Sequence, residues 1–580
     1  MRGDVGLELG RRIAAALKTA WDMDITPAEA LVRPSTRTGV DYQCNVAMSL
    51  ATTLQRQPRE IAETIVAHLD SADLVEPPKV AGLGFVNLVL TREWLQRQTA
   101  DLLTDDRIGV PTVEQPRRVA IDYSSPNVAK EMHVGHVRSS IIGDAITRML
   151  RFAGHEVMPH NHLGDWGTPF GMLLEHLIDE GATTDSSART VRDFTNFYQE
   201  ARKKFDADPD FATRSRQRVV LLHGGDEQTL ALWRQLVNIS TQYFETVYEL
   251  LGIGLTSADS YGESFYNPYL TDVITELESK GLTEVSDGAL CVFPSGFTNR
   301  EGERLPLIVR KSDGGYNYMT TDLATVRYWT RERDATDLLY VVGHPQAQHF
   351  QMIFAASREA GWLTEDHHAK HIGFGSILGE DGKTIRTRAG SSIKLIELLT
   401  EAIDQAANVV AVRSDLNETQ RAEVARAVGI GAVKYADLSS DREKDYVFSW
   451  KKMLAMDGNT AVYLQYANAR VLSVLRKAGE HPSPGTPVTL IEPAERELAL
   501  KLVQFPAAVY AAIDEYRPHK LCAYLYETAT AFSSFYESCP ILASSTPEEI
   551  RKSRLVLAQL TSRVLSLGLF LLGIHAPERL

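Results

Sequence analysis

The sequence predicts an α/β protein whose middle part is a doubly wound parallel sheet, with a small α+β unit before it and a helical end after it. Short apolar runs at 118–123, 157–161 and 338–342 have the length and composition of buried strands, and helical patterns follow the first and the last of them. Strands that alternate with helices are typical of a parallel sheet covered on both faces. The predicted centre of the chain is therefore a Rossmann-type domain.

The chain is expected to consist of three domains. Residues 1–112 are predicted to form the α+β unit, and a linker containing glycine and proline separates this unit from the middle of the chain. The Rossmann-type domain is predicted at 117–440, with an insertion of helices and short strands at about 170–300. Beyond residue 440 the pattern is almost wholly helical, with a long amphipathic helix at 461–477, so an all-helical domain is predicted at 441–580.

Composition places the chain among soluble globular proteins. Of its 580 residues 44% are hydrophobic and 23% are charged, and no stretch of uncharged apolar residues is long enough to predict a membrane span. The N-terminal residues lack the apolar segment of a signal peptide, so a cytoplasmic protein without a membrane partner is expected. Four cysteines lie far apart without a C-x-x-C pair, which predicts core thiols rather than disulfides or a zinc ribbon: Cys44, Cys291, Cys522 and Cys539.

The net charge of −14 argues mildly against a nucleic-acid partner, because lysine and arginine drive the binding of phosphate. The charge is unevenly spread, since residues 441–580 hold 16 Lys and Arg against 15 Asp and Glu. A nearly neutral helical end with local basic faces is compatible with a folded RNA, and equally compatible with no RNA partner.

The tetrad His133-Val134-Gly135-His136 stands where the first predicted strand, after a polar turn, gives way to a long helix. Unpaired backbone N–H groups and the helix dipole favour an anion at such a place, and two imidazoles three residues apart can both donate to phosphate oxygens. Gly135 lets a nucleotide approach the backbone. The alternative is a helix-capping histidine pair with a turn glycine, but it leaves Lys130, three residues upstream, unexplained.

Polar residues follow the carboxyl ends of the three predicted strands, where doubly wound folds place their ligands. They are Asp122 and Asn127 after the first strand, His162, Gly164 and Asp165 after the second, and Gln346 after the third. Each of them alone is explained equally well by a turn or a helix cap. Their shared location predicts a ligand site at this edge of the sheet.

A phenol and two carboxylates in the same region suit a cation. Tyr318 and Asp322 are four residues apart, so both project from one face if a helix begins here. Asp322 and Asp122 come from separate elements, and two such carboxylates with amides nearby can hold a guanidinium bidentately. The alternative is that Asp322 only stabilises the helix dipole.

A basic loop flanked by glycines lies at 379–390 and includes Lys383 and Arg386. Such a loop can close over a triphosphate and neutralise pyrophosphate as it leaves. A solvated hairpin with charged residues has the same composition, so the loop by itself is a weak indication.

Together these motifs resemble those of the class I aminoacyl-tRNA synthetases, and within that class the arginyl-tRNA synthetase family, over essentially the full length of the chain. The run Ser124–Lys130 before the tetrad, followed by Gly164–Gly167, marks the arginine enzymes. The segments 262–266, 464–470 and 573–580 are similar to later blocks of the family. The resemblance implies that the N-terminal domain touches the tRNA elbow and that the C-terminal helices form an anticodon-binding domain.

The resemblance also implies an activity: ATP-dependent attachment of L-arginine to tRNA(Arg) in protein synthesis, through an arginyl-adenylate whose formation waits for tRNA. ATP is a substrate, Mg2+ is the implied cofactor, and a monomer is expected. The implied arginine-binding residues are Asp122, Asn127, Tyr318, Asp322 and Gln346. The implied ATP-binding residues are His133, Gly135, His136, His162, Gly164 and Asp165. No side chain is assigned as a metal ligand.

The chain departs from the class at its second signature, K-M-S-K. That tetrad aligns with 384–387 and lacks the catalytic lysine; in many arginyl enzymes a lysine just before the first signature, here Lys130, stands in for it. Lys383 and Arg386 are rival cations, so the implied catalytic set is His133, His136, Lys130, Lys383 and Arg386. The rival interpretations are a relative that activates arginine without charging tRNA, a noncatalytic RNA-binding scaffold and another H-x-G-H nucleotidyltransferase.

Overall fold

The computed structural model describes residues 3–181, 194–383, 385, 393–411 and 416–580. Contacts divide the chain into two compact units. The first consists of Met1–Thr112, Ala455–Phe570 and His575–Leu580, and the second of Val113–Leu454 and Leu571–Ile574. The first unit therefore combines segments from both ends of the chain, and the predicted domain boundaries at 117 and 440 stay predictions.

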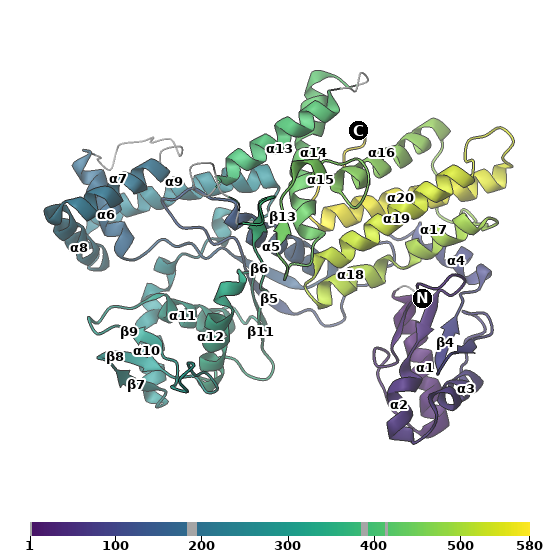
Figure 1. The fold of residues 1–580 in the computed structure, drawn as a ribbon, viewed down its shortest axis with the longest axis horizontal. Coiled ribbons are helices and arrows are strands. Elements are labelled where there is room, and N and C mark those ends of the chain that lie inside the picture. The colour runs from purple at the N-terminus through teal and green to yellow at the C-terminus, as the bar shows by residue number, and fades with distance from the viewer. Residues whose placement is uncertain (1–2, 182–193, 384, 386–392, 412–415) are drawn as a thin grey trace. The chain divides into compact units, whose positions relative to one another are not determined.

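Four short parallel strands form the central sheet of the second unit, in the order β11-β10-β5-β6 (Figure 1). They are β5 (Arg118–Asp122), β6 (Glu156–His160), β10 (Asp337–Tyr340) and β11 (His368–His371). The chain passes from β5 to β6 on one side and from β10 to β11 on the other, so its direction of travel reverses between β5 and β10. The predicted doubly wound parallel sheet is confirmed, and its switch point, where such folds bind ligands, lies between β5 and β10.

Helix α5 (Gly135–Ala153) connects β5 to β6 and approaches the end of β5 closely. Gly143 makes this approach possible, because a Cβ atom there would lie 2.3 Å from the side chain of Tyr123. Gly154 ends the helix in the left-handed conformation, with φ of 99°, as expected of a C-terminal cap. Because α5 begins at Gly135, the two histidines of the tetrad flank the first residue of the helix.

The predicted insertion between β6 and β10 consists of helices followed by a small antiparallel sheet. The helices are α6 (Thr168–Asp179), α7 (Phe194–Ala207), α8 (Pro209–His223), α9 (Glu227–Leu251) and α10 (Asn267–Ser279), with short 3-10 turns η2 (Ser257–Asp259) and η3 (Glu263–Tyr266). The sheet contains β7 (Thr283–Ser286), β8 (Ala289–Val292) and β9 (Leu307–Arg310). One hydrophobic cluster joins α10, the small sheet and the next two helices, α11 (Tyr318–Arg331) and α12 (Ala347–Glu359).

The remaining elements of the second unit include the helix that supports α5. These elements are η4 (His344–Gln346), β12 (Ile377–Leu378), α13 (Leu395–Val410), α14 (Glu418–Leu438), β13 (Tyr446–Val447) and α15 (Trp450–Met453). β12 and β13 pair in parallel. Nε of Arg138 in α5 lies 3.2 Å from Oδ2 of Asp437 in α14, and both side chains are buried. This ion pair holds α5, the helix that begins in the tetrad, against α14.

The N-terminal part of the first unit is an α+β domain, as predicted. Its sheet has the antiparallel order β1-β2-β4-β3. The elements are α1 (Val5–Trp21), β1 (Val32–Pro34), β2 (Tyr42–Cys44), α2 (Val46–Leu54), α3 (Pro58–His68), β3 (Lys79–Ala81), β4 (Phe85–Leu88) and α4 (Arg92–Leu102).

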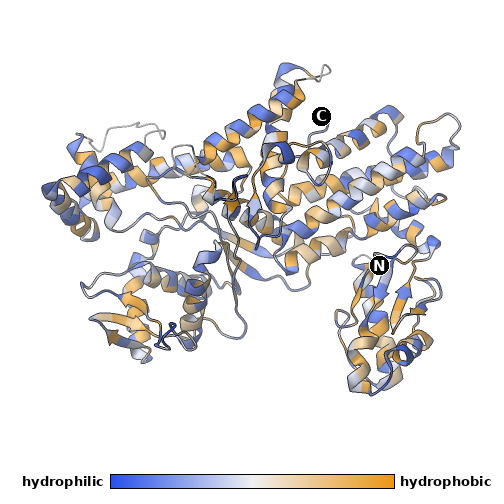
Figure 2. Cartoon of the chain, in the orientation of Figure 1, coloured by the Kyte–Doolittle hydropathy of each residue, from blue (hydrophilic) through white to orange (hydrophobic). Residues whose placement is uncertain are grey.

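The C-terminal part of the first unit is helical, as predicted, and contains α16 (Ala461–Ala478), α17 (Pro493–Val503), α18 (Phe505–Asp514), α19 (Pro518–Ser538) and α20 (Glu548–Leu571). Most of its helices carry both hydrophilic and hydrophobic residues along their length (Figure 2). By length and composition α20 is apolar enough to cross a membrane, but 72% of its most apolar window is buried, as in the core helix of a helical domain. All four cysteines of the chain are buried and outside any disulfide, which confirms the prediction of core thiols.

A buried ion pair joins the two parts of the first unit. Arg496 of α17 donates to both carboxylate oxygens of Asp41, at 2.9 and 2.7 Å, and to the carbonyl oxygen of Leu90 at 3.1 Å. The same carboxylate accepts the backbone N–H of Leu90 at 2.7 Å. Because the pair is bidentate and Asp41 is buried, it fixes both the distance and the orientation of the N-terminal sheet relative to α17.

Candidate active site

The switch point of the sheet holds a buried carboxylate. Asp122 is the last residue of β5, and its carbonyl oxygen accepts the backbone N–H of Val341 just after β10, at 2.8 Å. Its side chain accepts a hydrogen bond from the Ser125 hydroxyl at 2.7 Å and lies 3.8 Å from Nδ1 of His160. The structure thus places Asp122 at the carboxyl edge of the sheet, where the sequence predicts it.

The turn after β5 is strained and is held by a buried polar network. Ser124 and Ser125 both have positive φ, 74° and 49°, which is unusual for residues other than glycine. The backbone N–H of Ser124 donates to Ser139 at 2.9 Å, and the Ser124 hydroxyl is hydrogen bonded to Tyr248 at 2.8 Å. Oδ1 of Asn161 accepts a hydrogen bond from the backbone N–H of Ser125, and Nδ2 of Asn161 donates one to the hydroxyl of Tyr248, both at 3.1 Å. Strain that the surroundings maintain in this way is typical of functional sites.

The loops after β5 and β6 lie against each other. Asn127 and Gly164 form a parallel bridge, and the backbone N–H of Val128 donates to the Gly164 carbonyl at 3.0 Å. A Cβ atom on Gly164 would lie 2.3 Å from Oδ1 of Asn127, so any larger residue would displace the Asn127 side chain from this position. Asn127 itself is exposed. The predicted residues Asn127 and Gly164 are thus brought together.

The tetrad histidines have defined tautomers. Nδ1 of His133 accepts the backbone N–H of Gly135 at 3.0 Å, and Nδ1 of His136 accepts the backbone N–H of His133 at 3.1 Å. A ring nitrogen that accepts a hydrogen bond carries no proton, so in both neutral rings the proton is on Nε2. The ring centroids are 4.1 Å apart. The site therefore presents two neighbouring N–H donors of the kind that a phosphate requires.

The surroundings favour the neutral form of both histidines. Burial, together with the smaller effects of His133 and Lys130, lowers the pKa of His136 to about 3. Burial and Lys130 also lower the pKa of His133. Gly135 leaves room for the rings, because a Cβ atom there would lie 2.8 Å from Cε1 of His133. The histidines thus act as neutral hydrogen-bond donors, and Lys130 supplies positive charge beside them.

The three candidate cations differ in what the structure shows of them. Lys130 is exposed, and its Nζ lies 4.7 Å from the centroid of the Tyr198 ring. Lys383 is also exposed, and its backbone N–H donates to Asp381 at 3.1 Å. Arg386 lies outside the described residues. The structure therefore connects Lys130, through its effect on both histidine pKa values, with the tetrad.

The residues that come after the basic loop are attached to the tetrad. Val134 donates its backbone N–H to Ile393 at 3.0 Å, and Leu395 donates to Met132 at 2.9 Å. The ammonium of Lys394 lies 2.7 Å from the carboxylate of Glu131, which is almost fully buried. The described segment 393–395, which follows the loop in the sequence, is thereby held at the start of α5.

Tyr318 and Asp322 lie on one face of α11, as their spacing predicts. Tyr318 is the first residue of α11, after Asn317 as its N-terminal cap, so Tyr318 and Asp322 share one face. The carboxylate of Asp322 accepts a hydrogen bond from Nε2 of His349 on α12 at 2.6 Å. The His349 ring also lies 5.3 Å from that of Tyr318. Gln346, predicted nearby, is exposed at the end of η4.

Several carboxylates of this region influence one another. Burial, with a smaller contribution from the negative charge of Asp322, raises the pKa of Asp122 to about 6. Burial also raises the pKa of Glu263 to about 7, again with contributions from Asp165 and Asp322. A bound cation would stabilise the ionised forms of acids in such surroundings. This group of carboxylates therefore suits a compact, positively charged ligand.

The predicted residues after β6 take two different roles. His162 lies beside His160, with 3.4 Å between Nδ1 and Nε2, and its ring stacks on Tyr266. The carboxylate of Asp165 is buried and accepts both the hydroxyl of Ser264 at 2.6 Å and its backbone N–H at 2.9 Å. Asp165 thus holds the Glu263–Tyr266 turn in place with its side chain.

Two groups of described residues have metal-ligand chemistry, and one is in this site: Asp122, His160 and His162, whose ligand atoms lie within 4.8 Å of one another. Mg2+ prefers oxygen ligands and water, so two imidazoles and one carboxylate are a poor set for it. The prediction that no side chain here is assigned as a metal ligand stays a prediction.

Sequence reasoning missed several residues of the site. His349 lies in the segment after the third strand, and only the packing of α11 on α12 brings it to Asp322. Glu263 belongs to a segment that is similar to the family, but the sequence implies no role for it. Tyr198 and Tyr248 come from helices of the insertion, and no local pattern distinguishes them from ordinary helix residues.

The chain matches three protein families. Residues 98–450 match the catalytic domain of class I tRNA synthetases (R), residues 464–580 match the DALR anticodon binding domain, and residues 7–90 match the arginyl tRNA synthetase N-terminal domain. It is 50% identical to the arginine–tRNA ligase of Thermobifida fusca over 574 residues, covering 99% of both chains. It is 47% identical to that of Frankia casuarinae, over 95% of both.

Solved structures of similar fold cover the whole chain. The arginyl-tRNA synthetase of Plasmodium falciparum superposes with a TM-score of 0.86 at 27% identity, over 100% of each chain. That of Thermus thermophilus superposes with a TM-score of 0.83 at 26% identity, over 99% of this chain and 100% of the other. The likeness therefore extends over both units.

Proposed function

The chain belongs to the arginyl-tRNA synthetase family, and from this premise we propose how its residues attach L-arginine to tRNA(Arg) with ATP. The protein is an arginine–tRNA ligase of protein synthesis. The observation that carries the proposal is that one strand, β5, leads to both groups: the buried carboxylate of Asp122 ends the strand at the switch point, and the two histidines lie at the start of α5, the helix that follows it. The carboxylates suit the arginine side chain, and the histidines suit the phosphates of ATP.

Arginine binds with its guanidinium between Asp122 and Asp322. Carboxylates from two elements can each accept N–H donors of the planar group, and no other common amino acid presents them in this geometry. Tyr318 lies on the same face as Asp322 and covers the guanidinium. Asn127 and Gln346, both exposed after strand ends, hold the amino acid's polar end. Lysine is rejected because a single ammonium leaves one carboxylate poorly paired.

The first step joins arginine to AMP. A carboxylate oxygen of arginine attacks the α-phosphorus of ATP, the bond from that phosphorus to the bridging oxygen breaks, and pyrophosphate leaves with the electron pair. No general base is needed, since the nucleophile is already an anion. The Nε2–H groups of His133 and His136 donate to the phosphates, and Lys130 stabilises the growing negative charge. His162 and Gly164 border the nucleotide, and Asp165 holds the adjoining turn.

A bound Mg2+ ion would neutralise phosphate charge, and because Mg2+ prefers oxygen ligands and keeps several waters, few protein side chains would be needed to hold it. The side chains named above orient the nucleotide.

The tRNA meets both parts of the first unit. Residues 464–580 match an anticodon-binding domain, so the helices α16–α20 read the anticodon stem and loop. The α+β domain at residues 1–112 contacts the tRNA elbow. The terminal adenosine then enters the site, and its 2′-oxygen attacks the carbonyl carbon of the arginyl group. The bond from that carbon to the phosphate oxygen breaks, AMP leaves with the electron pair, and the hydroxyl proton passes to its phosphate. The enzyme works as a cytoplasmic monomer.

Arginine-dependent exchange of pyrophosphate into ATP tests the proposal. Purified protein should catalyse this exchange only when tRNA with an arginine anticodon is present. Exchange without tRNA would instead support a relative that activates arginine alone, and the absence of exchange in both conditions would support a noncatalytic scaffold. A parallel reaction with lysine in place of arginine is the control for specificity.

A further inference from the structure

The candidate catalytic lysine rests on an aromatic ring that comes from the insertion. Nζ of Lys130 lies 4.7 Å from the centroid of the Tyr198 ring, within the range of a cation–π interaction. The side chain of Lys130 is otherwise exposed. Among the described residues, Tyr198 thus makes the contact that restrains the position of the ammonium.

Helix α7, which carries Tyr198, is itself firmly anchored. The ring of Phe197 packs on that of His176 in α6, with 5.0 Å between the centroids. At the other end of α7, Lys204 is paired with Asp179 of α6 and lies over the Phe211 ring of α8. The position of Tyr198 is therefore determined by the packing of α7 on α6 and α8.

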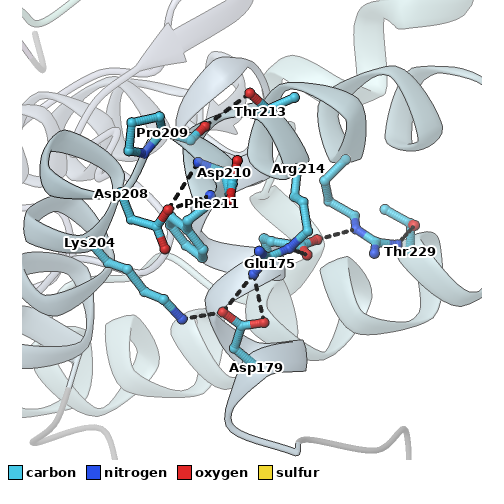
Figure 3. A network of polar contacts seen from close by, with 11 residues as sticks. Glu175, Asp179, Lys204, Asp208, Pro209, Asp210, Phe211, Thr213, Arg214 and Thr229 are labelled. Atoms are coloured by element: carbon cyan, nitrogen blue, oxygen red, sulfur yellow. Dashed lines mark hydrogen bonds and ion pairs between the residues drawn. The ribbon is translucent and has the colours of Figure 1, made fainter.

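A network of charges strengthens this anchor (Figure 3). Arg214 of α8 donates to Glu175 at 2.8 Å and to Asp179 at 2.9 Å, both on α6. Arg218 donates to the second oxygen of Glu175 at 3.0 Å. Because Asp179 is also the partner of Lys204, one carboxylate joins all three helices, as Figure 3 shows.

An aromatic face differs from a carboxylate in how it holds an ammonium. A carboxylate would neutralise the charge and occupy N–H donors, whereas a ring attracts the cation through its quadrupole and leaves the charge and the donors available. A phosphate oxygen can then replace water on the free side of Lys130. We propose that Tyr198 is a positioning residue, which holds the Lys130 ammonium, still charged, toward the phosphates of ATP during adenylate formation. The inference rests on the proposed role of Lys130.

Substitutions at Tyr198 separate the ring from the hydroxyl. Tyr198→Leu removes the aromatic face and should lower the single-turnover rate of adenylate formation roughly fivefold, the value of one exposed cation–π contact. Tyr198→Phe keeps the face and should stay within about twofold of the wild type. The KM for arginine should not change, since Tyr198 acts only through Lys130. Phe205→Leu is the matched control, because Phe205 is also on α7 and its cation–π partners are Arg202 and Arg216.

A double-mutant cycle with Lys130→Ala decides between positioning and mere support of the fold. In the Lys130→Ala background, Tyr198→Leu should not lower the single-turnover rate of adenylate formation any further. An equal loss in both backgrounds, or a loss in Phe205→Leu as large as that in Tyr198→Leu, would overturn the inference. If Lys130→Ala itself leaves the rate unchanged, the proposed role of Lys130 fails first. If Lys130→Ala is slow but Tyr198→Leu is not, only the inference about Tyr198 fails.

Discussion

Nε2 of His349 lies 2.6 Å from the carboxylate of Asp322, so the residue proposed to bind the guanidinium is already oriented by a histidine from the neighbouring helix. One carboxylate oxygen is engaged by His349, and the other can accept from the ligand. His349 therefore fixes the rotation of the Asp322 side chain before arginine arrives. Binding of arginine then requires a smaller loss of side-chain conformational entropy.

Removal of His349 should weaken arginine binding. In His349→Ala the carboxylate loses its hydrogen bond and can rotate, so the KM for arginine should rise about tenfold, as expected for one hydrogen bond to a charged group. The KM for ATP should stay the same. Steady-state exchange assays at varied arginine concentration measure both constants, and His349→Gln, which keeps a donor, should recover part of the loss.

Loss of the Asp322 charge should weaken arginine binding more than loss of His349 does. Asp322→Asn removes one of the two carboxylates that pair the guanidinium, and truncation of a buried charged partner costs about 2–5 kcal/mol, so arginine affinity should fall about 100-fold. Binding of ATP should be spared. Equilibrium titration with arginine, and separately with ATP, gives the two affinities. Unchanged arginine affinity in this variant would remove Asp322 from the pocket.

In the enzyme without arginine, the negative charge of Asp122 should lower the free energy of unfolding. Its folded pKa, about 6, lies above the usual value of 3.8 because the carboxylate is buried. The folded state therefore binds the proton more tightly than the unfolded state, and this contribution to stability is lost as the pH rises from about 4 to about 6. At about pH 7.5 Asp122→Asn should raise the free energy of unfolding by on the order of 2 kcal/mol, and this gain should vanish near pH 4.

Thermal melts at both pH values measure that difference. The same variant should lose arginine binding, because the amide cannot replace a carboxylate opposite the guanidinium. In the wild type, arginine affinity should decline as the pH falls below about 6, when Asp122 takes up a proton. A Tm of Asp122→Asn that matches the wild type at about pH 7.5 would contradict the assigned cost of burial.

Lys130 should matter more than Lys383 for adenylate formation. Lys130 lies close enough to the tetrad to lower the pKa of both histidines, whereas Lys383 is exposed in the basic loop. Lys130→Ala should reduce the single-turnover rate by about 100-fold, and Lys383→Ala by less than about tenfold. The reverse order of these rates would assign the catalytic cation to the loop.

A methyl group at Gly135 should disturb the histidine donors. The Cβ atom of Gly135→Ala would lie 2.8 Å from Cε1 of His133, so the ring must turn away from its place over the start of α5. We expect a loss of about 100-fold in adenylate formation, because a displacement of about 1 Å is enough for that. Gly254→Ala is a control for overall folding, since its Cβ atom would make only an ordinary contact, 3.4 Å from Asp144.

Much of the fold follows from local pattern. The strands at Arg118–Asp122 and Glu156–His160 begin and end within one residue of their predicted positions, because buried apolar runs bounded by polar turns are a strong signal. α11 begins at Tyr318, so the condition under which Tyr318 and Asp322 share one face is met. Spacing along one helix is a local property, so it can be read without knowledge of the packing.

Contacts between distant segments could not be predicted in the same way. His349 meets Asp322 only because α12 packs on α11, and Tyr198 meets Lys130 only because charged pairs among α6, α7 and α8 hold α7 in place. Periodicity tells which face of a helix is buried but not which helix covers it. Glu263 is a similar case, since its raised pKa depends on burial and on the charges of Asp165 and Asp322.

The sequence by itself determined the chemistry that the site carries: the parallel sheet, the two histidines at a helix start, the carboxylates at a strand end and near a helix start, and the family to which those motifs are similar. Only the tertiary structure decided how these groups act together. It assigned the proton of each histidine to Nε2, brought Asp322 close enough to Asp122 for its charge to raise the pKa of Asp122, and set the Lys130 ammonium over Tyr198. The physical reason is that hydrogen-bond direction, burial and charge proximity depend on the packing of elements far apart in the chain, which local residue order does not encode.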